Sequence, residues 1–320
     1  MLRKITKIIP ILTLALIGTV SCLTFSTFAE ENNTEIPPIW LQISPVSNRI
    51  TLEPKQIIDN EFTVENIGSE DFDYKVYATP YYASNGNYDL NFSVENSYTQ
   101  IARWITFQNP EGNYVDTFTT NIKKGEKQVI KYRVVVPADI PSGGQYAALF
   151  AESINKDSDQ TATGIKTISR VGLVLYANTN GETRRDADIA DYHFDKFKFS
   201  GKLTAGARIS NNGNTDFNAN YTYIVKTIFG KELHKDEQSY FVLPETSRDI
   251  SVEWADTPFM GIFQVNYKVV ASDNTEEQTS IVLVMPIFIA IIALLLLTII
   301  AIWIIILIRK RKEHKAKLLV

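Results

Sequence analysis

The stretch "DIPSGGQYAALFAES", Asp139–Ser153, decides the fold class. A proline and two glycines lead into an alternating aromatic and apolar run, which is typical of a β-strand. A weaker copy, "TPFMGIFQVNYKVVAS", occupies Thr257–Ser272. Glycine permits a sharp turn from a proline-fixed corner into a central strand beneath a bulky neighbour. The rival interpretation, a phosphate-binding loop, requires a following helix, so we favour a structural role for the glycines.

A second motif precedes each copy. "VENIGSEDF" (Val64–Phe72) and "ISNNGNTDF" (Ile209–Phe217) align at an offset of 145, whereas the proline–glycine–aromatic motifs align at an offset of 117. Asn-x-Gly suits a tight turn between strands, because both residue types tolerate positive φ. The repeat predicts two domains of one topology, with about 28 additional residues in the first.

Short alternating runs rich in Val, Ile, Tyr, Phe and Thr fill the chain between its two apolar ends. Their spacing of roughly 8–12 residues predicts antiparallel sandwiches. The expected fold class is all-β, with two tandem immunoglobulin-like β-sandwiches followed by one C-terminal transmembrane helix. We expect domain 1 over 38–180 and domain 2 over 190–280, joined by the polar linker "GETRRDAD". Separate cores with a polar linker allow two unfolding transitions.

The two ends of the chain predict secretion and anchoring. Residues 1–29 have a basic start, an apolar stretch and a small-x-small cleavage site, and indicate a signal peptide. Cys22 lies within it, so a lipid anchor there is an alternative. We expect a transmembrane helix over 286–308 and a cytoplasmic basic tail over 309–320, because basic residues beside a span stay inside. The predicted location is the cell membrane, single-pass, with the N-terminal domains extracellular.

Charge and residue types argue against several function classes. Between the leader and the span lie 23 basic and 35 acidic residues, an acidic balance that repels nucleic acid. The histidines there, His193 and His234, lack metal-ligand neighbours at the usual spacing, and the mature chain has no cysteine. We therefore predict no enzyme activity, no catalytic residues, no metal and no cofactor. A surface glycosidase stays an alternative, because the distance between carboxylates is invisible in a sequence.

The additional segment of domain 1, roughly Ala78–Thr120, is rich in aromatic and amide side chains. Such a mixture suits sugars and peptides, because it offers apolar contact and hydrogen bonds together. We expect a hairpin or strand-loop excursion there that domain 2 lacks. In "ARWITF" we expect Trp104 and Phe107 to belong to the core. The candidate ligand-binding residues, for which a structural role is an equal alternative, are Tyr81, Tyr82, Tyr88 and Tyr114.

The order of these motifs resembles the WxL-interacting proteins of Gram-positive cell surfaces. The resemblance rests on "ISPVSNRITLEPKQIIDNEFTVENIGSEDF", "ARWITF", "KKGEKQVIKYRVVVPADIPSGGQYAALF" and "RVGLVLYANTNG". It implies a peptidoglycan-binding first domain, a partner-binding second domain and a membrane span with a basic tail. Domain 2 is shorter here than the resemblance implies for the second module. The family contributes no catalytic residues.

These observations predict a non-enzymatic, membrane-anchored cell-surface binding protein. Its expected partners are a cell-wall glycan or a surface protein, together with the membrane, and no nucleic acid. Two alternatives differ in class. One is a chaperone-like accessory subunit that donates or accepts a strand from a secreted partner, which requires an open sheet edge. The other is the surface glycosidase, which requires two carboxylates facing each other across a cleft.

Overall fold

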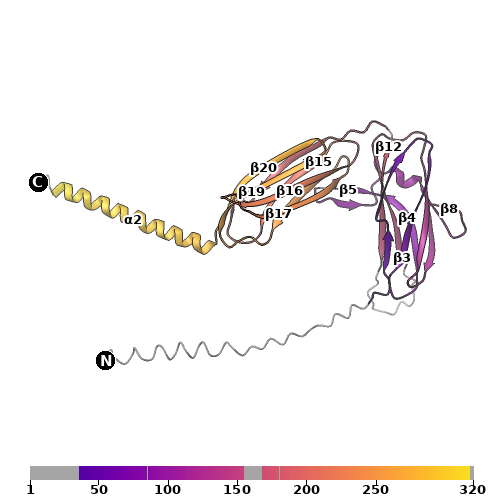
Figure 1. Ribbon diagram of the computed structural model, residues 1–320, viewed down its shortest axis with the longest axis horizontal. Helices are drawn as coiled ribbons and strands as arrows, with labels where there is room; N and C mark the ends of the chain where they lie inside the picture. The colour runs from indigo at the N-terminus through magenta and orange to yellow at the C-terminus, as the bar shows by residue number, and fades with distance from the viewer. Residues whose placement is uncertain (1–35, 85, 155–167, 180, 318–320) are drawn as a thin grey trace, which may run out of the picture. The chain divides into compact units, whose positions relative to one another are not determined.

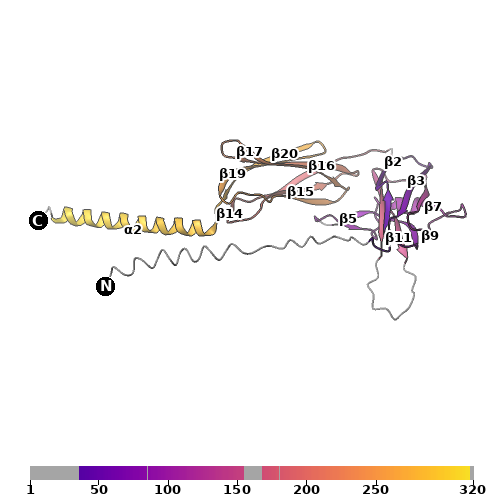
Figure 2. The same ribbon diagram turned by 60° about the horizontal axis from the view of Figure 1, so that its bottom comes forward.

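The computed structural model describes residues 36–84, 86–154, 168–179 and 181–317. The predicted signal peptide 1–29 lies outside the described residues. Figure 1 and Figure 2 show the strands gathered in two groups, followed by the C-terminal helix α2 (Ile287–Lys317). The expected fold class, two immunoglobulin-like sandwiches and one apolar C-terminal helix, is confirmed.

The first sandwich consists of two five-stranded sheets and a small hairpin. One sheet has the order β1-β3-β10-β7-β8, the other β2-β12-β11-β4-β9, and β5 pairs with β6. Its elements are β1 (Leu41–Ser44), β2 (Ser47–Leu52), β3 (Ile57–Asn66), β4 (Phe72–Pro80), β5 (Tyr82–Ser84), β6 (Asp89–Asn91), the 3-10 helix η1 (Gln100–Trp104), β7 (Ile105–Gln108), β8 (Tyr114–Val115), β9 (Thr117–Ile122), β10 (Lys127–Val135), β11 (Gly144–Ile154) and β12 (Arg170–Thr179).

The second sandwich repeats this topology. Its sheets have the orders β13-β15-β18 and β14-β20-β19-β16-β17. Its strands are β13 (Ala187–Phe194), β14 (Phe197–Lys198), β15 (Leu203–Asn211), β16 (Phe217–Thr227), β17 (Glu232–Val242), β18 (Ser247–Trp254), β19 (Gly261–Ala271) and β20 (Asn274–Val284). The two layers are separated in Figure 2, where β15 lies apart from β16, β17 and β20. In each sandwich the first strand forms an antiparallel pair in one sheet, β1 with β3 and β13 with β15. The second strand then forms a parallel pair in the other sheet, β2 with β12 and β14 with β20.

The additional residues of the first sandwich lie between β4 and β9, where the second has only a turn between β16 and β17. They form the β5–β6 hairpin, η1 and the β7–β8 pair, which extends one sheet. The expected excursion is therefore present. "ARWITF" is divided between η1 and β7, with Phe107 fully buried and Trp104 half-buried against the core.

Two boundaries differ from expectation. The strands of the second sandwich extend beyond 190–280, from Ala187 to Val284. β13 begins earlier because the chain at Arg184 and Asp186 already pairs with the backbone of Asn214 and Asn212. β20 continues to Val284 because that residue pairs with Gly261 at the start of β19.

Each sandwich has its own apolar core. Alternation along β3, β4 and β10 buries one face of each strand, as the strand period of two requires. β11 is instead buried on both faces from Gly144 to Ala151. Phe62, Tyr74 and Tyr132 are among the large side chains that fill the first core. Tyr223 and Tyr267 are among those that fill the second.

Candidate functional site

The two Asn-x-Gly turns have the same hydrogen bonds. In the first sandwich the Gly68 amide donates to the Asn66 side-chain oxygen at 2.9 Å, and the Asn66 side-chain nitrogen donates to the Glu70 carbonyl at 2.8 Å. In the second, Asn211 accepts from Gly213 at 2.9 Å and donates to the Thr215 carbonyl at 2.9 Å. Both asparagines are buried. The turns are thus closed by the buried amide side chain itself.

The reason that we expected for the glycines in these turns is wrong. Neither Gly68 nor Gly213 has a φ in the left-handed region. Instead a Cβ at Gly68 would collide with the backbone of Pro38 and Trp40, and one at Gly213 with the Arg184 carbonyl. Glycine is needed because the chain that enters each sandwich crosses close over the turn.

The double glycine of "PSGGQY" joins the two sandwiches. Gly143 has φ +105 and its position has no room for a Cβ against the Asn214 carbonyl of the second sandwich. The Gly144 amide donates to that carbonyl at 2.8 Å. The ring of Tyr146 covers Gly144, so a Cβ there is also blocked, and Phe263 covers Gly261 in the same way in the repeat. The bulky neighbour that we expected is therefore the aromatic residue two positions after each glycine, Tyr146 for Gly144 and Phe263 for Gly261.

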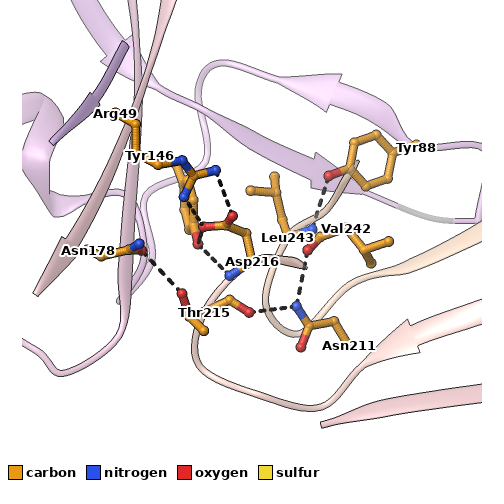
Figure 3. A network of polar contacts seen from close by, with 9 residues as sticks. All are labelled: Arg49, Tyr88, Tyr146, Asn178, Asn211, Thr215, Asp216, Val242 and Leu243. Carbon is orange, nitrogen blue, oxygen red and sulfur yellow. Dashed lines mark hydrogen bonds and ion pairs between the residues drawn. The ribbon is translucent and has the colours of Figure 1, made fainter. Parts of the chain in front are cut away.

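A buried carboxylate lies at the centre of the contact between the sandwiches (Figure 3). Asp216 is 5% exposed and pairs with Arg49 of β2, whose Nη2 lies 2.9 Å from Oδ2. The Tyr146 hydroxyl donates to Asp216 Oδ1 at 2.9 Å and accepts from the Asp216 amide at 3.0 Å. Burial, and then the neighbouring carboxylate, raise the pKa of Tyr146. Thr215 adds a hydroxyl hydrogen bond to the Asn178 side chain at 3.2 Å.

The β5–β6 hairpin also contacts the second sandwich, and we call residues 81–84 and 86–92 the arm. The Leu243 amide donates to the Tyr88 hydroxyl at 3.1 Å (Figure 3). The Asp249 amide donates to the Gly86 carbonyl at 2.7 Å, and the Arg248 guanidinium lies 4.4 Å from the centre of the Tyr88 ring. The additional segment of the first sandwich is therefore a contact element between the two.

Aromatic side chains fill the space beneath the arm. Tyr176 of β12 stacks edge-on with Phe241 of β17 at 4.6 Å between ring centres, and the Arg49 guanidinium lies 5.1 Å from the centre of the Tyr176 ring. Such contacts stabilise beyond the area that they bury. We call this group the junction cluster. Its members are Tyr77, Tyr81, Ala83, Tyr88, Phe92, Tyr98, Tyr146, Ala148, Phe150, Val174, Tyr176, Phe241 and Leu243.

The four tyrosines predicted to bind a ligand do not form one surface. Tyr81 is 7% exposed and, like Tyr88, belongs to the junction cluster. Tyr82 is half-buried and lines a hollow beside the arm together with Arg208 and Glu245. Tyr114 lies away from them on β8, where its ring packs 4.1 Å from the Arg133 guanidinium. Their role in binding stays a prediction, and the burial of Tyr81 favours the structural alternative for that residue.

An open edge in the first sandwich is a second candidate site. We use this name for β9 and residues 127–131 of β10. Among the described residues, β9 pairs with β4 on one side and with no strand on the other. β10 pairs with β3 along its length, and on its other side it pairs, in the described structure, with β7 over Tyr132–Val134 alone. Both strands therefore have one side without a neighbouring strand. Between them is a hollow of about 360 Å³ lined by Gln108, Asn109, Pro110, Phe118, Thr120, Gln128, Val129, Ile130 and Lys131.

The ladder register shows which backbone groups face this hollow. The Asn66 amide donates to the Glu126 carbonyl, and the Val136 amide donates to the Gln56 carbonyl, so the even-numbered residues of β10 bond to β3. Hydrogen-bonded pairs alternate along an antiparallel ladder. The amide and carbonyl of Val129 therefore face the open side, and its side chain is 56% exposed. The Gln128 side chain bridges the hollow by donating to the Asn121 carbonyl of β9 at 2.8 Å.

The sequence predictions missed Arg49, Asp216 and the open edge. Asp216 was visible only as one member of a repeated turn motif, and Arg49 as an ordinary charged strand residue. Their partners are distant in sequence, and no local pattern indicates such a pair. The described residues contain no group of three His, Cys, Asp or Glu side chains placed to hold a metal ion.

Comparisons with known proteins add a likeness of fold. No protein-family profile and no curated protein matches the chain, so the resemblance to WxL-interacting proteins stays a prediction. Among solved structures, the class 5 fimbriae chaperone CfaA is 15% identical, with a TM-score of 0.36, over 77% of this chain and 99% of that one. A chain of the chaperone–adhesin complex CsuC–CsuE of Acinetobacter baumannii is 13% identical, with a TM-score of 0.37, over 75% of this chain and 97% of that one. The E. coli chaperone DraB is 10% identical, with a TM-score of 0.34, over 76% of this chain and 97% of that one. Likeness at this level carries no argument about function.

Proposed function

We propose that this chain is a non-enzymatic, membrane-anchored surface protein that holds a partner protein by accepting a strand at the open edge. One observation carries the proposal. In the described residues, β9 and residues 127–131 of β10 each have one side without a neighbouring strand, and both sides border the same hollow. An exposed sheet edge is a template for an added strand, whose main-chain hydrogen bonds supply affinity. A surface-protein partner is thus the class that this geometry favours.

The chemistry of the hollow suits an extended peptide. The Val129 amide and carbonyl face it, and both the exposed Val129 side chain and the half-buried Phe118 line it. A partner strand would pair its backbone with Val129 and place alternate apolar side chains toward Phe118, since strand side chains alternate between faces. The Gln128 side chain now donates a hydrogen bond to the Asn121 carbonyl, and a backbone amide of the partner strand would replace it as donor. Binding of wall glycan by the tyrosines remains a separate prediction.

The anchor is part of the proposal. Residues Ile287–Ile308 of α2 have a mean hydropathy of 3.4 and are long enough to cross a bilayer. Six basic residues follow in the sequence over 309–320, which supports a cytoplasmic location for that end. Protease added to intact cells should remove both sandwiches and spare a tag placed after Val320. Loss of the tag would contradict this orientation.

A photo-cross-linking experiment tests strand addition. A benzophenone amino acid is placed at Val129 in the full chain in its own cells, and at Gln264 as a control. Gln264 is also an exposed strand residue, but β19 is paired on both sides there, with Lys226 of β16 and Ile281 of β20. We expect one discrete protein adduct from Val129 and none from Gln264, with the cross-linked partner segment alternating in polarity.

Hydrogen exchange then decides how that segment binds. A synthetic peptide of the cross-linked segment should slow exchange of the Val129 amide, which faces the open side, and leave the already paired Ile130 amide unchanged. Equal adducts at both positions, or an unchanged Val129 amide, would exclude strand addition here. Sedimentation of the full chain with purified peptidoglycan, abolished by Tyr82→Ala, would then favour the glycan prediction.

A further inference from the structure

One end of the second sandwich is covered with exposed apolar side chains. Phe229 is 91% exposed, Phe259 66% and Met260 56%. Residues that are this large and this exposed rarely cluster on a protein surface without a partner. We call the group the apolar tip. Its members are Phe197, Phe199, Ile228, Phe229, Phe259 and Met260.

The strand register places this tip at the end of the sandwich from which α2 leaves. β16 ends at Thr227, which pairs with Phe263 near the start of β19. Gly261 pairs with Val284, the last residue of β20, and Phe197 pairs with Leu283. The β16–β17 turn, the β18–β19 loop and β14 therefore meet where β20 ends. The ring of Phe259 lies 5.8 Å from that of Phe288, in the first turn of α2.

Among the described residues, the opposite end of the same sandwich exposes no large apolar side chain, because Phe241 and Leu243 there are covered by the first sandwich. Its turns are the Asn-Gly turn at Asn211, the loop at Glu245 and the β19–β20 turn at Asp273. Every large apolar side chain that is exposed among described residues 187–284 belongs to the tip or to Ile262 and Ile281, which lie near it on β19 and β20. The asymmetry indicates a surface for one particular environment.

Lysines surround the apolar tip. Lys226 and Lys231 flank the Ile228–Phe229 turn, and three more lie around Phe197 and Phe199, namely Lys196, Lys198 and Lys202. Among the described residues, Lys198 is paired with Asp195 and Lys202 with Glu253. Aromatic side chains edged by lysine are typical of surfaces that meet lipid headgroups.

The short connection between β20 and α2 holds the second sandwich close to the membrane. The apolar part of α2, Ile287–Ile308, has 22 residues, a length of about 33 Å at ~1.5 Å per residue. This matches the roughly 30 Å hydrocarbon core, so Ile287 lies at its boundary. Only Met285 and Pro286 separate β20 from α2, and two extended residues span at most about 7 Å. A headgroup layer of about 5–8 Å therefore already reaches the tip.

We propose that the apolar tip is seated in the lipid interface, with its aromatic side chains at the acyl boundary and its lysines at the headgroup phosphates. This inference rests on the proposed membrane anchoring of α2. The seat holds the second sandwich against the bilayer at several loops as well as at the Met285–Pro286 joint. It would thereby limit rotation about that joint and keep the open edge of the first sandwich at a fixed height.

Spin-label depth measurements test the seat. Single-cysteine variants of the full chain, on a Cys22→Ser background, are reconstituted in nanodiscs of phosphatidylcholine and phosphatidylglycerol. Nitroxides are attached at Phe229→Cys and Phe259→Cys, with Thr275→Cys at the opposite end of the same sheet as control and Leu297→Cys in α2 as the lipid reference. Accessibility to oxygen and to a water-soluble nickel complex is measured for each.

We expect the labels at positions 229 and 259 to be shielded from nickel at least several-fold relative to position 275, and to lie shallower than position 297. If these labels are as accessible to nickel as the label at position 275 while position 297 is in lipid, the tip does not lie in the lipid interface, although α2 is still a membrane anchor. If position 297 is itself open to nickel, both are wrong. As a second readout, Phe259→Asp should expose a label at position 229. Val46→Asp in the first sandwich should not, although Val46 is 68% exposed against 66% for Phe259.

Discussion

At the residue scale, glycine has two separate functions in this fold. In the Asn-x-Gly turns it makes room for a crossing chain, and at Gly143 it also adopts a φ of +105. The sequence indicated that Gly68 matters, because its motif repeats, whereas Gly143 has Met260 as its counterpart in the copy. It did not indicate why, because the atoms that exclude a Cβ belong to distant segments: Pro38 and Trp40 at Gly68, and Asn214 at Gly143.

Gly143→Ala should cost more than an ordinary glycine substitution. Gly112 is the matched control, because it has φ +88 and open space around the missing Cβ. For Gly112→Ala we expect a loss of about 1–2 kcal/mol from backbone strain alone. For Gly143→Ala we expect about 3 kcal/mol or more, because overpacking against Asn214 is added to that strain. Urea unfolding of the full chain in micelles measures both, and equal losses would show that Asn214 does not restrict the site.

Tyr146 should make the protein sensitive to alkaline pH. Its pKa is raised in the folded state, by burial first and then by Asp216. A group with a raised folded pKa contributes stability that is complete below its unfolded value of about 10 and is lost as pH rises above it. The free energy of unfolding should therefore begin to fall near about pH 10 and keep falling at higher pH, until Tyr146 also ionises in the folded state. Tyr146→Phe should reduce this fall, and an unchanged slope in that variant would assign the effect to other buried tyrosines.

At the scale of elements, the repeat predicted most of the fold. Two motif offsets that differ by 28 located an insertion between equivalent strands, and the structure has β5, β6, η1, β7 and β8 in that interval. The destination of the arm was not predictable. Tyr88 meets Leu243 and Gly86 meets Asp249, and such pairings depend on how two complete sandwiches pack. Tyrosines that suit a ligand surface in a sequence suit a protein–protein contact equally well.

Substitutions in the inserted segment should separate a buried anchor from an exposed one. Tyr81 is 7% exposed in the junction cluster, so Tyr81→Ala should destabilise the chain by about 3–5 kcal/mol, as large core truncations do. Tyr114 makes one cation–π contact with Arg133 on the surface, so Tyr114→Ala should cost only about 0.5–1 kcal/mol. Thermal unfolding measures both. A marginal effect of Tyr81→Ala would restore that residue as a ligand-binding candidate.

At the scale of the whole molecule, the contact between the sandwiches decides how they unfold. A polar linker suggested two independent transitions. The structure instead joins the sandwiches through a buried carboxylate, backbone hydrogen bonds at Gly144 and Leu243, and an aromatic cluster. Unfolding one sandwich alone would break the contacts of Asp216 with Arg49 and Tyr146 and expose the apolar junction cluster to water. The two cores should therefore unfold together.

Fluorotryptophan NMR of the full chain in micelles distinguishes these outcomes, because Trp104 reports on the first core and Trp254 on the second. In the unaltered chain both signals should disappear at the same temperature. Asp216→Asn removes the charge paired with Arg49 and should cost about 1–3 kcal/mol, with the Trp254 signal lost first. Asp71→Asn is the control, because Asp71 is the exposed equivalent in the first sandwich and accepts a hydrogen bond from the Lys124 amide at 2.7 Å. That variant should keep the two signals coincident. Signals that separate already in the unaltered chain, or that stay coincident in Asp216→Asn, would show that the buried carboxylate does not couple the sandwiches.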